Sequence, residues 1–346
     1  MRKIIIALDV GYGNTKLVFG RDTNNWSDLC FRSIAPKIIT PQSDMSKGFS
    51  GSLDRVTVEV GGSSYLVGPE AHVSGGSVVL STDFVDLPEY LALLRGSILY
   101  AMKKTGSVFN HIDVLVLGLP VSNWQPKQAK LTQLGSGPHP ITVPMALRSA
   151  FGEQVEVTVA KVMVLPQPMG ALHYANYCLS AENKLKPTGV HMVIDPGYNT
   201  FDWFVSIGLR PDVQRCGSLQ GGVSQLLKLV ANAAGSRLGV GSLNLLEVEH
   251  GLETGIMQVH GQKLNMNEFR PMVQTAAEQV VDRFINSIDM SLGISTLQLA
   301  GGGAPFYLEA LRKAFKGYDI TVSSASVMAN ARGFYLVGEA MSGMMK

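Results

Sequence analysis

The sequence predicts an α/β fold in which two similar domains each present a turn suited to phosphate. Residues 4–19 and 190–205 share one pattern: an apolar run, an aspartate, a turn containing glycine, and a second apolar run. The two copies lie about one domain length apart in the sequence. A glycine triplet at 301–303 follows another apolar run, which adds a third segment of the same kind.

In the first copy, Asp9 ends a predicted strand, and Gly11 and Gly13 occupy the turn. Glycine reaches backbone angles that are closed to other residues, so the N–H groups of such a turn can line a concavity for phosphate oxygens. From there Asp9 can hold Mg2+ through water, and Lys16 can reach a phosphate. A single Asp-Gly turn is more often an ordinary hairpin, and the second copy favours the functional interpretation.

The second copy supports this interpretation because it matches the first without gaps. Asp195 and Gly197 take the places of the aspartate and the first glycine, and Asp202 takes the place of the lysine. Asp202 can hold metal-bound water, or it is simply a carboxylate on a strand. Two such hairpins in register predict two domains whose phosphate turns act on one nucleotide.

Two further glycine motifs stand between apolar segments. Gly301, Gly302 and Gly303 follow a predicted strand and precede a helix, so the backbone can approach a flat ring or a ribose closely. Gly221 and Gly222 open another predicted helix and allow the same interpretation. Each motif is also compatible with a plain flexible or tight turn.

Gln167 lies between Pro166 and Pro168 at the end of a predicted strand, which restricts its backbone. In a functional interpretation its amide orients a water molecule for attack on a terminal phosphate, a reaction in which positioning provides most of the catalysis. The alternative is an ordinary polar residue that caps the following helix.

The apolar pattern also predicts the domain organisation. We expect a first domain over residues 1–165 with an insertion at about 31–87, and a second over 166–324 with an insertion at about 223–290. The C-terminal helix, residues 325–346, is expected to pack back on the first domain.

Composition excludes several classes of protein. The chain has 346 residues, of which 46% are hydrophobic and 16% charged. Its net charge is +2, and the sequence contains no long run of basic residues. Direct nucleic-acid binding and a membrane span are therefore not expected. The scattered cysteines Cys30, Cys178 and Cys216 fit no disulfide framework or metal spacing and favour the cytoplasm. The chain has no P-loop motif.

In this order, the motifs resemble those of the actin/Hsp70/sugar-kinase ATPase superfamily over the whole chain. The details are most similar to bacterial actin-like plasmid segregation proteins of the ParM/StbA type. The segments that carry this likeness are Leu-Pro-Val at 119–121, the helix opening at 217–224 and the segment 330–337. The resemblance implies duplicated actin-like (ribonuclease H-like) domains around a nucleotide cleft.

The resemblance also implies ATP or ADP with Mg2+, polymerisation into filaments, and plasmid DNA attached through a DNA-binding adaptor protein. It implies the roles of individual residues. Asp9 and Asp195 hold the metal through water, and Gln167 and Asp195 serve catalysis. The implied nucleotide contacts are Asp9, Gly11, Gly13, Asn14, Lys16, Gly197, Asn199, Thr200, Gly301, Gly302 and Gly303. From the residues themselves, we add Asp202 as a catalytic candidate and Gly221 and Gly222 as nucleotide contacts. Gln167 departs from the ParM pattern, in which glutamate is usual. Pro196, Tyr198 and Asn199 depart from the glycine-rich form of the second turn.

Three other functions remain open on the same fold. A small-molecule kinase requires an aspartate base near the strand ends of the first domain, and residues 117–121 offer none. A non-polymerising, chaperone-like nucleotide switch is expected to need an attached peptide-binding domain, for which the chain has little room. A relative tied to the membrane is expected to need an amphipathic tail.

Overall fold

The structure is a computed structural model that describes residues 3–22, 25–38, 53–289, 291 and 293–344. Residues 39–52 of the first predicted insertion, and the last two residues of the predicted C-terminal helix, lie outside the described residues. None of the described helices is both long and apolar enough to cross a membrane.

The chain divides into two compact units, which are described separately. Unit 1 comprises Met1–Glu182 and Met328–Lys346, and unit 2 comprises Asn183–Val327. The boundary expected at 165/166 falls where helix α4 (Gln167–Cys178) begins, so the two divisions differ in the assignment of this helix. Its main packing partner is α9 (Ala329–Met344), which also belongs to unit 1.

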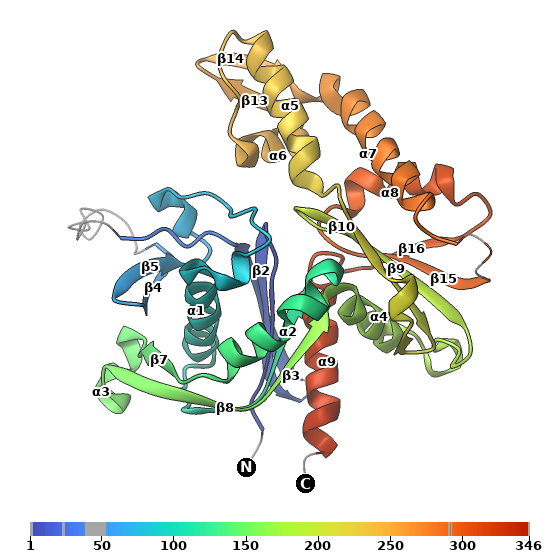
Figure 1. Cartoon of the computed structure of the whole chain (residues 1–346). Helices are drawn as coiled ribbons and strands as arrows, with labels where there is room; N and C mark the ends of the chain where they lie inside the picture. Colours follow the sequence, from blue (N-terminus) through green and yellow to red (C-terminus); the bar gives the residue numbers. More distant parts are fainter. Residues whose placement is uncertain (1–2, 23–24, 39–52, 290, 292, 345–346) are drawn as a thin grey trace. The chain divides into compact units, whose positions relative to one another are not determined.

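Unit 1 is built on one six-stranded sheet (Figure 1). The strand order is β3-β2-β1-β6-β8-β7, with β1, β6 and β8 parallel and the other pairings antiparallel. The remaining elements of unit 1 are β1 (Ile5–Val10), β2 (Asn14–Asp22), β3 (Asn25–Arg32), β4 (Val56–Val60), β5 (Ser63–Val67), α1 (Pro88–Thr105), β6 (His111–Leu119), α2 (Val121–Ser136), β7 (His139–Thr142), α3 (Arg148–Phe151) and β8 (Gln154–Pro166).

Helices cover both faces of this sheet, which explains why β1 and β6 are continuously apolar. On one face Ile5 and Val116 pack with Phe334 of α9. On the other face Leu117 meets α2, where a Cβ on Gly135 would lie 3.0 Å from the Leu117 side chain. Successive residues of a strand point to opposite faces of the sheet. Because helices cover both faces, the side chains on each face are buried.

Two glycines allow α4 and α9 to cross closely. A Cβ on Gly333 of α9 would lie 1.7 Å from the carbonyl oxygen of Gly170 in α4, so no larger residue fits this crossing. Arg332 of α9 donates to the Tyr174 hydroxyl of α4 and pairs with Asp28 of β3 at 2.7 Å. The expected C-terminal helix thus packs on unit 1, next to the start of the chain.

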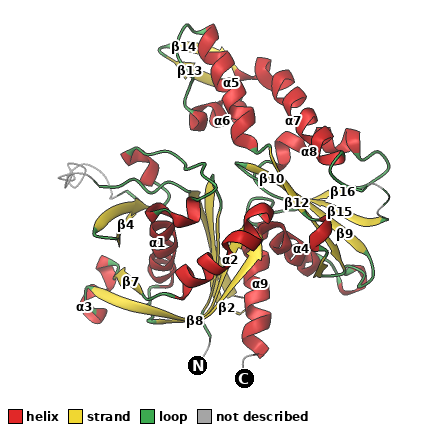
Figure 2. Ribbon diagram, in the orientation of Figure 1, coloured by secondary structure: helices red, strands yellow, loops and turns green. Residues whose placement is uncertain are grey.

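Unit 2 repeats the central part of this topology (Figures 1 and 2). The hairpin β9–β10 corresponds to β1–β2, and the parallel strands β15 and β16 stand where β6 and β8 stand in unit 1. The predicted duplication is therefore confirmed. The elements are β9 (Val190–Pro196), β10 (Thr200–Ile207), β11 (Arg210–Pro211), β12 (Gly217–Gln220), α5 (Val223–Arg237), α6 (Leu245–Thr254), β13 (Ile256–Val259), β14 (Gln262–Asn265), α7 (Arg270–Ile285), β15 (Ile294–Leu299), α8 (Ala304–Ala314) and β16 (Ile320–Val322).

The core of unit 2 lies between this sheet and the helices α5, α7 and α8. Phe201 and Trp203 of β10 both contact Phe284 of α7, with ring centroids 5.4 and 5.2 Å apart. Phe284 lies on the buried face of α7, together with Val280 and Val281. Because Asp195 and Asp202 alternate with core residues along their strands, they lie on the opposite face of the hairpin.

Candidate functional site

The two predicted phosphate turns have the same backbone geometry. In unit 1 the N–H of Gly11 donates to the carbonyl of Asn14 at 3.1 Å, and in unit 2 that of Gly197 donates to Thr200 at 2.8 Å. These pairs occupy equivalent places in the two copies. Asn14 and Thr200 begin the returning strands, so each turn is tied across its base and its shape is fixed by the hairpin.

The turn of unit 1 places three predicted site residues in direct contact around the carboxylate of Asp9. Asp9 and Lys16 are cross-strand partners, and Lys16 Nζ lies 2.7 Å from Asp9 Oδ2. Gln167 Nε2, from the first turn of α4, donates to Asp9 Oδ1 at 2.6 Å. Asp9 is fully buried, so a cation and an amide together compensate its desolvation.

Tyr90 of α1 adds a second buried polar group near this carboxylate. Burial, and to a lesser extent the negative charge of Asp9, raises the pKa of the Tyr90 phenol. The phenol is therefore neutral at physiological pH. Its ring contacts Phe84, which in turn stacks on Tyr12 of the turn with centroids 5.9 Å apart.

In unit 2, Asp195 and Asp202 stand in the register positions of Asp9 and Lys16. The alignment of the two sequence copies is thereby confirmed at this position. Both side chains are buried, and Thr200 Oγ1 donates to Asp202 Oδ2 at 2.9 Å. Two carboxylates opposite each other on antiparallel strands have Cβ atoms within about 5.5 Å. They form a concentrated source of oxygen ligands.

The glycine triplet lies against the second hairpin. A Cβ on Gly301 would lie 2.1 Å from Asp195 Oδ1, and the residue has a φ of +81°, so both contact and backbone require glycine. Gly303 donates its N–H to the Pro196 carbonyl at 2.9 Å. A Cβ on Gly302 would meet nothing within 4 Å, which leaves the backbone there open to a ligand.

Gly221 and Gly222 also lie against the second turn, and each has a structural reason to be glycine. The N–H of Gly222 donates to Asn199 at 3.1 Å, and a Cβ there would clash with the backbone of the turn. A Cβ on Gly221 would lie 2.7 Å from the Val280 side chain, and Tyr307 donates to the Gly221 carbonyl at 2.5 Å. The first two N–H groups of α5, those of Val223 and Ser224, donate to carbonyls of the turn at 3.0 and 2.8 Å. A nucleotide contact by these two glycines stays a prediction.

Sequence reasoning missed two residues that shape the first turn. Ser33 donates through its Oγ to the Gly11 carbonyl at 2.6 Å and through its N–H to the Gly13 carbonyl at 3.0 Å. Gly118, at the end of β6, makes room for the carboxylate: a Cβ there would lie 3.1 Å from Asp9 Oδ1. Neither residue carries a motif, because strand pairing alone brings them to the turn.

The oxygen donors in both units fit a magnesium ion. Mg2+ binds through one or two carboxylates and keeps several waters, so it does not need a cage of protein ligands. Asp9 in unit 1 and the pair Asp195 and Asp202 in unit 2 provide carboxylates of this kind. Among the described residues there is no group of three or more His, Cys, Asp or Glu side chains arranged to hold a metal directly.

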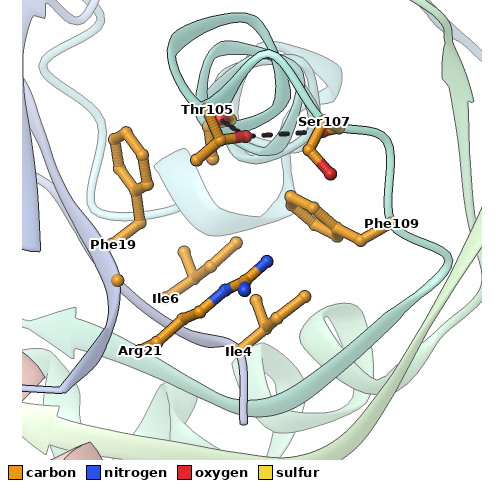
Figure 3. Close-up of a pocket in the computed structure, with 9 residues that line it drawn as sticks. Ile4, Ile6, Phe19, Arg21, Thr105, Ser107 and Phe109 are labelled. Carbon is orange, nitrogen blue, oxygen red and sulfur yellow. Dashed lines mark hydrogen bonds between the residues drawn. The ribbon is translucent and has the colours of Figure 1, made fainter. Parts of the chain in front are cut away.

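A small apolar cavity of about 40 Å3 lies at the other end of β1 from Asp9, between the sheet and the C-terminal end of α1 (Figure 3). Ile4, Ile6, Phe19 and Phe109 contribute to its lining, with Arg21 beside them. The space holds about one water molecule. It is therefore too small for a nucleotide.

Comparisons with known proteins match both parts of the chain. Residues 7–170 match the family model described as the N-terminal domain of actin-like proteins. Residues 193–313 match the model of the C-terminal domain of MreB-like archaeal actin homologues. None of the curated protein sequences compared with the chain matched it.

Several solved structures share the fold over nearly their whole length. The archaeal actin homologue Ta0583 is 18% identical, with a TM-score of 0.76 and 97% of this chain and 99% of that chain covered. The apo ParM protein of pSK41 is 19% identical, with a TM-score of 0.68 and 99% of each chain covered. A 15-stranded ParM filament from Clostridium botulinum is 17% identical, with a TM-score of 0.73 and coverage of 98% and 100%. Ta0583 has also been solved in complex with ADP.

Proposed function

Because the chain belongs to the actin-like proteins, we propose that it is an ATPase that polymerises into filaments with ATP and Mg2+ to segregate or position plasmid DNA. The observation that carries the proposal is the pair of equivalent hairpins, with Asp9–Lys16 and Asp195–Asp202 in one register. Similarity to an ADP-bound actin homologue and to a filament-forming ParM supports the nucleotide and the polymer.

In this proposal each turn contributes backbone N–H groups to the phosphates. Residues 11–14 and 197–200 provide them, and Gly302 packs on the nucleoside. Asp9 and Asp195 hold Mg2+ through water, where the ion neutralises charge on the phosphates. Lys16 already compensates the charge of Asp9, so its ammonium is well placed to be shared between that carboxylate and an incoming phosphate.

Gln167 orients the attacking water in this proposal. A carboxylate only accepts hydrogen bonds, so the atom of Gln167 that faces Asp9 must be the amide nitrogen. The amide oxygen is thereby directed elsewhere and can accept a hydrogen bond from water. Glutamine is not a proton acceptor in this role, and its contribution is positional. Asp202 completes the unit 2 side by holding metal-bound water.

We propose that the partners are further copies of the chain in the filament and a DNA-binding adaptor protein, in the cytoplasm. The modest net charge gives no reason to expect direct contact with DNA. The alternatives on the same fold are a small-molecule kinase and a non-polymerising, chaperone-like nucleotide switch, and the following experiment separates them from the filament.

High-speed sedimentation of the full chain with ATP, ADP or no nucleotide tests polymerisation, and phosphate release measured in parallel tests hydrolysis. We expect pelleting that requires Mg2+ and ATP. Asp195→Asn removes a proposed metal-holding carboxylate and should reduce turnover on the order of 10²-fold or more. The exposed Asp319→Asn removes the same charge away from both turns and serves as the control.

Turnover without pelleting at any protein concentration, together with phosphorylation of a sugar or acid, would support the kinase and reject the filament. ATP binding without pelleting or substrate phosphorylation would favour the nucleotide switch. Equal turnover of the two aspartate variants would show that Asp195 does not hold the metal.

A further inference from the structure

A second pocket in unit 1, distinct from the phosphate turn, carries an unusual set of polar groups. It has a volume of about 290 Å3 and is lined by residues of α1, the end of α2 and the turn into β7. Figure 1 labels these elements. We call it the Arg95 pocket. The residues that matter for its chemistry are Leu91, Arg95, Lys130, Gln133, Leu134 and His139.

Arg95 is a partly buried cation with no ion-pair partner among the described residues. Its Nη1 donates to the main-chain carbonyl of Glu59 at 2.8 Å, and its buried Nε–H has no acceptor among the described residues. Burial lowers the pKa of the guanidinium, which remains charged at neutral pH. Within the part of the chain that the structure describes, no carboxylate lines the pocket. Among the described residues, this half-buried guanidinium therefore has no carboxylate as counter-ion.

His139 provides a complementary group. Its Nε2 lies 3.0 Å from the Gly135 carbonyl, which only accepts, so the proton of the neutral ring is on Nε2 and Nδ1 is a bare acceptor. The ring is 1% exposed, and Nδ1 has no donor among the described residues. Burial, with the nearby charge of Arg95, lowers the pKa of this imidazole and keeps it neutral. Two residues that line the pocket thus carry, just beneath its surface, a donor and an acceptor with no partner among the described residues.

The other lining residues fit a small organic anion, because they combine positive charge with apolar side chains. Lys130 adds a second positive charge at the rim, where its Nζ lies 3.8 Å from Asp86, and Gln133 adds an amide. Leu91 and Leu134 supply apolar walls. The pocket volume of about 290 Å3 lies just below the range for small-molecule sites, about 300 to 1,000 Å3.

We propose that the Arg95 pocket binds the phosphoryl group of a small phosphorylated molecule. A guanidinium binds phosphate oxygens with two parallel hydrogen bonds. A phosphoryl group that retains one proton presents both acceptor oxygens for Arg95 and an O–H donor for His139 Nδ1. An ionised carboxylate accepts only, so it leaves the imidazole unpaired. Both nitrogens are shielded from solvent, and entry therefore requires a rotamer change in the lining.

The pocket is separate from the proposed nucleotide contacts of unit 1. Asn123, in the first turn of α2, donates to Tyr12 of the phosphate turn at 3.3 Å. Lys130, Gln133 and Leu134 lie two to three turns further along the same helix, on the order of 10 to 17 Å away along its axis. Variants can therefore address the two places independently.

Calorimetric titration of the full chain with inorganic phosphate tests the proposal. We expect Arg95→Gln to weaken phosphate binding at least tenfold and Lys130→Gln to weaken it about threefold. Lys104→Gln removes the same charge from an exposed position of α1 outside the pocket and should leave the affinity unchanged. Lys16→Gln alters the phosphate turn. Phosphate should still bind to this variant, and that remaining binding should be weakened when Arg95→Gln is added. If Arg95→Gln does not fold, the comparison of Lys130→Gln with Lys104→Gln decides the question.

Phosphate binding that is lost in Lys16→Gln and unchanged in Arg95→Gln and Lys130→Gln would overturn the proposal, because all binding would then be at the turn. Equal competition by acetate would overturn the assignment to a phosphoryl group. The failure of ATP-dependent sedimentation would leave this result unaffected, because no nucleotide is present in the titration.

Discussion

At the scale of single residues, the contact between Gln167 and Asp9 explains how a glutamine can stand at this position. The amide donates to a fully buried carboxylate at 2.6 Å, whereas a glutamate would bring a second negative charge to the same distance. Two carboxylates this close do not both ionise, and one retains a proton. The chain therefore combines a buried acid with an amide that is neutral at every pH.

This contact predicts the behaviour of Gln167→Glu. At low pH the new carboxyl is protonated and can replace the amide as donor to Asp9. As pH rises it loses the proton and repels Asp9, so we expect ATP turnover to fall on the order of tenfold between pH 6 and 9 relative to the unaltered chain. Steady-state phosphate release over this range measures the effect, with the exposed Gln262→Glu as control. Parallel pH profiles for Gln167→Glu and the unaltered chain would contradict the argument.

One buried and one half-buried histidine of unit 1 predict a loss of stability in mild acid. Burial lowers the pKa of both His139 and His173 in the folded state. The unfolded chain takes up these protons near pH 6.5, so the unfolded state binds more protons and the free energy of unfolding falls as pH drops through this value. The slope is at most about 1.4 kcal/mol per pH unit for each histidine.

Thermal unfolding midpoints between pH 7.5 and 5.5 measure this loss. His139→Gln should flatten the dependence, and the exposed His72→Gln controls for the removal of a histidine as such. A midpoint in the unaltered chain that stays constant over the range would disprove the prediction.

At the scale of elements, the crossing of α4 and α9 depends on the absence of a side chain. The methyl group of Gly333→Ala would lie 1.7 Å from the Gly170 carbonyl oxygen. The atoms that it would meet belong to the backbone of α4, which cannot rotate away as a side chain can. We expect the helices to separate and the free energy of unfolding of unit 1 to fall by about 3 kcal/mol or more.

Gly343→Ala provides a matched control on the same helix, because a Cβ there meets no atom within 4 Å. Alanine favours helix over glycine, so this control should be neutral or slightly stabilising. Chemical denaturation of both variants, followed by far-ultraviolet circular dichroism, makes the comparison. Equal stability of the two variants would show that the crossing adapts easily.

At the scale of the whole molecule, the two units differ in how the chain builds them. Unit 2 is one continuous segment, Asn183–Val327, and its sheet and helices form their own core. Unit 1 needs both ends of the chain, because α9 covers the face of β1 and β6 that carries Ile5 and Val116.

We therefore expect residues 183–327 to fold when expressed alone, with a cooperative thermal transition. Residues 1–182 alone should expose the face that α9 covers and be much less stable, and adding residues 328–346 as a peptide should raise the midpoint. Circular dichroism melting curves provide the measurement. A cooperative transition in residues 1–182 that the peptide does not change would contradict the role assigned to α9.

The sequence by itself determined the two hairpins, their equivalence and the duplicated α/β fold. This was possible because an apolar run, an aspartate and a glycine turn specify strand and turn locally. The alignment of Asp9 with Asp195 and of Lys16 with Asp202 needed only the repeat, and strand register places both pairs alike. The nucleotide and metal roles of these residues stay predictions.

Only the tertiary structure decided which distant groups meet. Gln167 donates to Asp9 across 158 positions of sequence, Ser33 supports the first turn from the residue after β3, and Gly170 meets Gly333 across the whole of unit 2 in the chain. Arg95 and His139 likewise line one pocket, and no sequence motif predicts that they do. Local patterns fix secondary structure, whereas these contacts depend on strand order and helix crossing, which no single segment encodes.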